Sequence, residues 1–271
     1  MKRLLTIKAL IGFALVAMVL GVAIFAPIFI PEEAANRMHM TARLKSPSGL
    51  YWLGTDQLGR DLLFRVMRGA RTSLSIAVSA VLISLLLGLP LGLIAGFYRG
   101  AIDNVLMRLV DTLLSFPVLL LALVISAMLG PSIPNAIIAI GVAFAPFLAR
   151  VVRGEVLRVV QMPYVEAARA AGARDQRLIV RHILPNIMPP IIVQATISLA
   201  FAILAEAGLS FLGLGTQPPQ SSWGLMIQAS RDYLDVAPWT ALVPGAAVAL
   251  TVLGLNMSGD ILRDIFDPRS K

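Results

Sequence analysis

Six long apolar segments constrain this chain more than any other feature of its sequence. Each can cross a bilayer, because about 20 apolar residues in a helix span about 30 Å of hydrocarbon. Lipid offers the backbone no hydrogen-bond partners, so the segments are predicted to be helices, and none alternates as a barrel strand does. They lie at 8–30, 72–98, 105–129, 134–152, 186–213 and 240–261. The sequence therefore predicts an all-α polytopic membrane protein with six transmembrane helices.

The composition agrees with this class. The chain is 58% hydrophobic and 14% charged, whereas a soluble domain is about half apolar and about a quarter charged. The net charge of +8 comes from basic residues that lie between the apolar segments, so we expect loops beside a membrane and no nucleic-acid partner. The sequence has no cysteine, which excludes disulfides and thiolate metal sites.

The first segment also sets the predicted orientation. Lys2, Arg3 and Lys8 precede it, as they would precede the apolar part of a secretory signal. It runs too far for a signal, to residue 30, so an uncleaved first span is favoured. With the N-terminus inside, most of the 23 Lys and Arg residues lie at the inner side, as the positive-inside rule requires. Both termini and the loop 153–185 are then predicted to be cytoplasmic.

Two regions are predicted along the chain. Residues 1–71 hold the first span and an external polar segment, and residues 72–271 form a core of five spans. In the external segment, Thr55 or Asp56 is expected to cap a short amphipathic helix that ends near Ala70 and lies at the membrane surface. The alternative is a polar loop that only joins two spans.

Three patterns concern the packing and shape of the spans. Glycines recur every four residues in the second span and form a smooth stripe against which another helix can pack closely; they are Gly88, Gly92, Gly96 and Gly100. In the third span, Arg108 and Asp111 have the spacing of a local ion pair. Residues 115–117, Ser-Phe-Pro, are predicted to kink that span.

A charged segment between the fourth and fifth spans, residues 161–183, is predicted to form a helical elbow. Pro163 suits a first helical turn, and Gly172 suits the left-handed residue that ends a helix. Asp175 favours the first turn of a second short helix, and Arg181 favours its last turn. Pro185 then suits the start of the fifth span. We therefore expect two short helices around a glycine corner.

Several kinds of chemistry are missing from the sequence. His39 and His182 lie in loops predicted on opposite sides of the membrane, so no histidine metal site is expected. No lysine follows a glycine, which excludes a Walker A phosphate loop, and no G-x-S-x-G nucleophile motif occurs. We therefore expect no catalytic residue, cofactor or metal in this chain, and uphill work would need a partner or an ion gradient.

At the elbow, the sequence resembles a known family. Glu166-Ala167-Ala168, followed by Gly172 and Leu184-Pro185, is similar to the EAA loop of bacterial ABC importer permeases. The general pattern has isoleucine two residues before that leucine, where this chain has His182. The form of residues 181–186, Arg-His-Ile-Leu-Pro-Asn, resembles the dipeptide, oligopeptide and nickel importer branch.

The resemblance extends over most of the chain, from about 50 to 269. It favours the second, C-type permease subunit of those importers. The matching stretches are 54–61, Met107-Arg108 with Asp111, 129–132, 206–215, 222–224, and Gly259-Asp260 with 267–269.

The resemblance implies a type I importer permease in a bacterial cytoplasmic (inner) membrane, with a cytoplasmic coupling helix. It implies a homologous second permease, two cytoplasmic ATP-binding subunits, an extracytoplasmic substrate-binding protein and membrane lipid as partners. ATP and magnesium would be bound by the partner subunits. The residues expected to couple the elbow to an ATP-binding subunit are Tyr164, Glu166, Ala167, Ala168, Arg169, Gly172, Arg174 and Arg181.

One carboxylate lies inside an apolar span. Glu206 is costly to bury in lipid, and such a group usually faces a cavity or a partner. We favour a place on the translocation path for Glu206 and for Ser210 one turn later. The alternative is a structural hydrogen bond.

Other functions fit the sequence less well. An ion-coupled carrier or a channel would place charges near the membrane midplane, whereas Asp111 and Glu206 are predicted near opposite surfaces. For the importer, peptides are the favoured substrate. Nickel or another metal chelate and glutathione remain alternatives, since importers of all three share these motifs.

Overall fold

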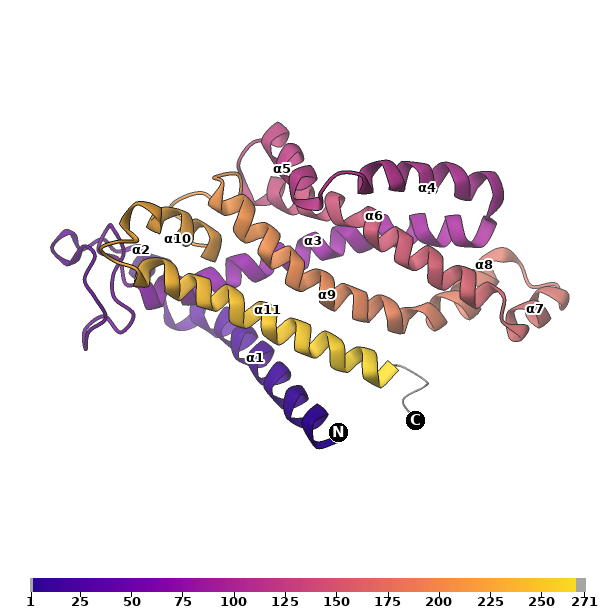
Figure 1. The fold of residues 1–271 in the computed structure, drawn as a ribbon, viewed down its shortest axis with the longest axis horizontal. Coiled ribbons are helices and arrows are strands. Elements are labelled where there is room, and N and C mark those ends of the chain that lie inside the picture. The colour runs from indigo at the N-terminus through magenta and orange to yellow at the C-terminus, as the bar shows by residue number, and fades with distance from the viewer. Residues whose placement is uncertain (1, 267–271) are drawn as a thin grey trace.

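The computed structural model describes residues 2–266, with side chains at Lys8 and from residue 10 onward, and is almost entirely helical (Figure 1). Five helices are long and apolar enough to cross a membrane, or six spans if a bent pair counts as one, which confirms the predicted fold class. They are α1 (Lys2–Phe29), α3 (Leu62–Tyr98), α6 (Ile133–Val160), α9 (Leu184–Phe211) and α11 (Trp239–Phe266), and the bent pair is α4 (Gly100–Leu114) with α5 (Val118–Leu129).

Shorter elements lie at the two ends of the bundle. The elbow end carries α7 (Pro163–Ala170) and α8 (Asp175–Arg177), and the far end carries α2 (Glu32–Asn36) and α10 (Trp223–Ser230) (Figure 1). Single 3-10 turns occupy Met40–Ala42 and Arg231–Tyr233, and Leu178–Ile183 is π-helical. The expected family stretch at 267–269 lies outside the described residues.

The third predicted span is broken. The kink expected at residues 115–117 is confirmed, but a single helix over 105–129 is wrong, because α4 and α5 meet at 87°. Pro117 has no N–H to donate and restricts Phe116 to extended conformations, so the helix ends at Leu114 and restarts after the proline.

The second span begins earlier than predicted. α3 starts at Leu62, where the Asp61 carboxylate accepts hydrogen bonds from the N–H groups of Leu63 (2.9 Å) and Phe64 (3.4 Å). It continues to Tyr98, so the separate amphipathic helix ending near Ala70 is wrong. No residue near Ala70 breaks the helix. The boundary at 71–72 therefore falls within α3, and the two-region division stays a prediction.

The glycine stripe packs α3 against α6. A Cβ atom added to Gly88 or Gly92 would lie 2.7 or 2.5 Å from the carbonyl oxygen of Ala145 or Ala149. At Gly96 it would lie 2.8 Å from Cβ of Val156. The packing prediction is confirmed for these three, because only glycine allows the two backbones to approach so closely. It is wrong for Gly100, which begins α4 at φ +60° in open space.

Ion pairs tie α4 to α6. Asp103 accepts from Nε and a terminal nitrogen of Arg153, both at 2.6 Å. Asp111 pairs with Arg150, so the predicted local pair with Arg108 is wrong. The i, i+3 spacing favours Arg108, whereas the tertiary fold places Arg150 of α6 beside the Asp111 carboxylate.

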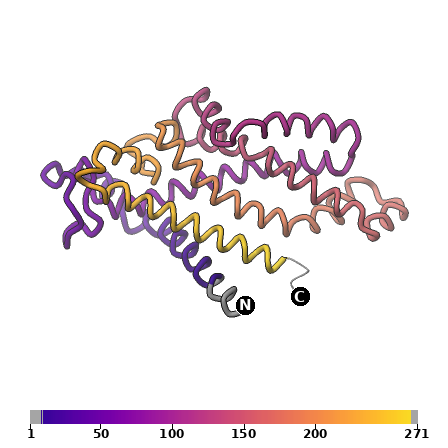
Figure 2. Tube along the Cα trace, viewed as in Figure 1, coloured from indigo at the N-terminus to yellow at the C-terminus, as the bar shows by residue number. Residues whose placement is uncertain are grey.

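The first and last helices complete the bundle. α1 packs against α11 and α3, with Val19, Ala23 and Ala26 buried (Figure 2). Its other face exposes large apolar side chains, such as Phe13, Met18 and Ile24, as expected of a lipid-facing surface.

Candidate coupling and translocation sites

The glycine corner of the elbow is confirmed. Pro163 stands at the start of α7, and Gly172 has φ +81°. Around it, the N–H of Ala173 donates to the carbonyl of Ala168 at 3.1 Å, which closes the last turn of α7 in the manner of a Schellman motif. The chain thereby reverses away from α7 over a few residues.

The second arm of the elbow is longer than predicted. α8, the π-helical turn and α9 follow one another without a break over Asp175–Phe211. Pro185 stands in the first turn of α9, as predicted. The N–H of Leu184 donates to the carbonyl of Ile179, five residues back. This wider turn accommodates Pro185, whose ring would clash with a carbonyl in a regular α-helix. The second arm of the elbow is therefore continuous with α9.

The underside of the elbow is anchored to the bundle. Val165 of α7 and Leu178 and Ile183 of the second arm are buried in one apolar cluster with Val156 and Ile187. The guanidinium of Arg169 lies 5.7 Å from the centre of the Phe97 ring, a cation–π contact with the end of α3. The elbow is thus fixed to the ends of α3, α6 and α9.

The outer face of the elbow is exposed. The structure brings the predicted coupling residues together at this end, where the elbow projects beyond the bundle (Figure 1). Glu166 forms no ion pair within residues 2–266. Ala168 is half-buried, and the exposed members are Tyr164, Glu166, Ala167, Arg169, Gly172, Arg174 and Arg181.

Glu206 and Ser210 are both buried, at the place where α9 meets α3 and α10. Ser210 Oγ donates to Glu206 Oε1 at 2.7 Å and accepts from the N–H of Thr216 at 3.1 Å. Nearby, the N–H of Trp223 donates to Ser73 Oγ of α3 at 3.2 Å. Oε2 of Glu206 has no well-aligned hydrogen bond among the described residues, although the side chains of Ser73 and Ser222 lie close to the carboxylate. Their place on the translocation path stays a prediction.

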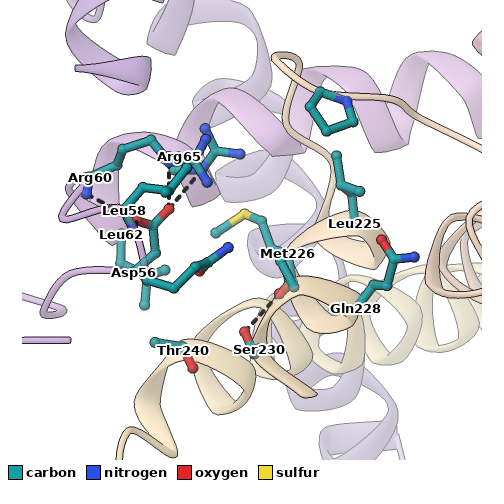
Figure 3. Close-up of a pocket in the computed structure, with 13 residues that line it drawn as sticks. Asp56, Leu58, Arg60, Leu62, Arg65, Leu225, Met226, Gln228, Ser230 and Thr240 are labelled. Carbon is teal, nitrogen blue, oxygen red and sulfur yellow. Dashed lines mark hydrogen bonds and ion pairs between the residues drawn. The ribbon is translucent and has the colours of Figure 1, made fainter. Parts of the chain in front are cut away.

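A charged pocket at the far end was not predicted. Its volume is about 190 Å³, and Asp56, Arg60 and Arg65 line one side, opposite Leu225 and Met226 of α10 (Figure 3). The signal in the sequence is the run of charges in 54–61, which also resembles the family. Among residues 2–266, no cluster of three or more His, Cys, Asp or Glu has a geometry that would hold a metal.

The multi-pass bundle and the projecting elbow define the class, a helical transport permease. The family of binding-protein-dependent transport system inner membrane components matches residues 88–271. The chain therefore belongs to this family, and the resemblance to ABC importer permeases is confirmed.

Curated relatives cover almost the whole chain. It is 45% identical to the dipeptide transport system permease protein DppC of Alkalihalophilus pseudofirmus, over 97% of this chain and 86% of that protein. It is 44% identical to the di/tripeptide transport system permease protein DppC of Pseudomonas aeruginosa, over 97% and 88%. It is 40% identical to the glutathione transport system permease protein GsiD of Pectobacterium atrosepticum, over 94% and 85%.

A solved structure shares the fold. An inward-facing structure of the MetNI methionine ABC transporter matches with a TM-score of 0.63 at 21% identity, over 76% of this chain and 98% of that chain. At this identity, the match concerns the fold alone.

Proposed function

We propose that this permease imports peptides across a bacterial cytoplasmic membrane, paired with a homologous permease and driven by two ATP-binding subunits. The chain would supply half of the path, and its sequence has no Walker A loop, so ATP and magnesium would be bound by the partner subunits. Peptides are favoured because dipeptide and di/tripeptide permeases are 44–45% identical to this chain. The glutathione permeases, at 40–43%, keep glutathione as the second candidate.

The observation that carries this proposal is the elbow, whose outer face is exposed and whose underside is buried against the helical bundle. An ATP-binding subunit would hold the thin, alanine-rich α7 in a groove, with Glu166 as a fixed charge for a polar partner and the arginines against acidic rims. Closure of that subunit on ATP would move the elbow as a rigid body. Because the elbow continues into α9 and packs on α6, the movement would switch the path between its inward-facing and outward-facing forms.

The orientation follows from this docking. The elbow end and both termini would face the cytoplasm, and the far end, with α2 and α10, would receive an extracytoplasmic binding protein. The exposed apolar faces of α1 and the other spans would contact lipid.

The substrate is tested on the cognate binding protein, because that subunit selects the cargo. Calorimetric titration with dipeptides, tripeptides, longer peptides and glutathione is expected to give tight binding of a peptide class. Tight binding of glutathione with none of peptides would reverse the order of the two candidates.

For Glu206 and Ser210, we propose a role beside the path where α9 meets α3 and α10. Replacing Glu206 with alanine removes the acceptor for the Ser210 hydroxyl. Transport per assembled complex is expected to fall about tenfold, which corresponds to about 1.4 kcal/mol, while assembly is kept. Glu206→Gln keeps an acceptor and serves as the matched control, with most transport retained. If Glu206→Ala lowers only the amount of complex and leaves transport per complex unchanged, the carboxylate is structural.

A further inference from the structure

The pocket at the far end holds three buried charges. Asp56, Arg60 and Arg65 are each less than a tenth exposed, although all three line the same cavity (Figure 3). Burying charged groups costs free energy unless each is paired. The ion pairs among these three residues therefore determine which further group the pocket can bind.

The single carboxylate is already fully engaged. Oδ1 of Asp56 accepts from the N–H groups of Leu58 (2.9 Å) and Arg60 (3.0 Å). Oδ2 accepts from Nε of Arg60 at 2.6 Å and lies 3.6 Å from Nε of Arg65. Asp61 does not line the pocket, and its carboxylate caps α3 instead.

The two arginines retain unused donors. Arg65 donates from one terminal nitrogen to the neutral Asn36 side chain at 2.6 Å. The two terminal nitrogens of Arg60 have no acceptor in the part of the chain that the structure describes. Two guanidinium groups share one carboxylate, so the pocket carries a net positive charge that favours an anionic group.

The size of the pocket limits the anion. Its volume of about 190 Å³ is below the roughly 300–1,000 Å³ of typical small-molecule sites. A peptide does not fit, whereas one carboxylate side chain does. Arginine forms paired hydrogen bonds to a carboxylate, which gives such a contact both strength and direction.

We propose that this pocket is a socket for one acidic side chain of the extracytoplasmic binding protein. This inference rests on the proposed function, which turns the far end toward that partner. A carboxylate bound beside Arg60 would neutralise the net positive charge of the pocket. It would also hold the binding protein against α10 and the start of α3.

The test measures the dissociation constant between the complete transporter, in lipid nanodiscs without nucleotide, and its purified binding protein. Arg60→Gln is expected to weaken binding about 30-fold, as loss of one partner of a buried charge pair does. Arg60→Lys keeps the charge and is expected to lose less. Arg231→Gln removes an exposed arginine at the same end and is expected to change binding less than about threefold.

A second variant covers the case in which Arg60→Gln fails to assemble. Ala229 also lines the pocket, so Ala229→Leu fills it while leaving the three charges in place, and it is expected to weaken binding to a similar degree. Asp and Glu residues of the binding protein are then neutralised one at a time. One of these changes should weaken binding as much as Ala229→Leu does, and combining it with Ala229→Leu should weaken binding no further.

The outcomes separate the two levels of the proposal. If the unaltered transporter binds no binding protein, the proposed function fails. If it binds, and the filled or neutralised pocket binds equally well, the socket alone is refuted. Loss of the second permease from either variant would assign the pocket to the permease contact and would also refute the socket.

Discussion

Glu166→Ala in α7 is expected to uncouple the transporter, with ATP-driven uptake reduced at least about 30-fold while the complex still inserts in the membrane. Glu166 is exposed and unpaired within the described residues, so its removal costs the fold little. In the docked complex it would lie in a water-poor groove, where losing one charged partner costs about 2–5 kcal/mol. Uptake into proteoliposomes and stimulation of ATPase activity by loaded binding protein are the measurements.

The matched control is Glu33→Ala, which removes an exposed carboxylate at the far end and is expected to leave both activities unchanged. Gly172→Val should act like Glu166→Ala, because φ +81° disfavours a β-branched residue and the corner would be redirected. Unchanged uptake and unchanged ATPase stimulation in both elbow variants would refute the coupling role.

Gly92→Val is expected to have the second large effect, on the stability of the bundle. Its Cβ would lie 2.5 Å from the Ala149 carbonyl oxygen and 2.6 Å from Val152 Cβ, so α3 and α6 must move apart. Overpacking of this kind costs about 1–3 kcal/mol, and we expect the upper end because backbone cannot yield as a side chain does. The measurement is the thermal midpoint of the purified, detergent-solubilised complex.

Gly154→Val is the control for Gly92→Val. Gly154 lies on α6 itself, but a Cβ there would meet no atom within 4 Å. Its midpoint is expected to stay near that of the unaltered complex. Equal midpoints for both variants would mean that the close α3–α6 contact does not support the bundle.

The spans were predictable because lipid imposes a length and a composition on any helix that crosses it. Their ends were less so. Leu62, Leu63 and Phe64 are apolar, but three arginines before residue 72 separate them from the long apolar run, and the Asp61 cap sets the start of α3. Pro117 predicts that the helix breaks at residues 115–117. The angle of 87° depends on how α4 and α5 pack on α6.

The elbow was predictable because its signals are local, such as proline at a first turn and glycine at a left-handed corner. Its anchoring was not, because Val165, Leu178 and Phe97 come together only in the fold. The same holds for Asp111, whose partner Arg150 is 39 residues away. The far-end pocket could not be predicted for the same reason, since Arg65 and Met226 line one cavity only through tertiary packing.

The most direct measurement of the coupling role uses the absence of cysteine from the chain. A single cysteine at Ala167, exposed on α7, would carry a short photocrosslinker in the complete complex; Leu50→Cys, at a residue 78% exposed in the segment before α3, would be the control. The Ala167→Cys variant is predicted to crosslink to an ATP-binding subunit, with a yield that changes on adding ATP, and the Leu50→Cys variant is not. Crosslinks from Ala167→Cys only to lipid or to the binding protein, in a complex that keeps its ATP-binding subunits, would contradict the account.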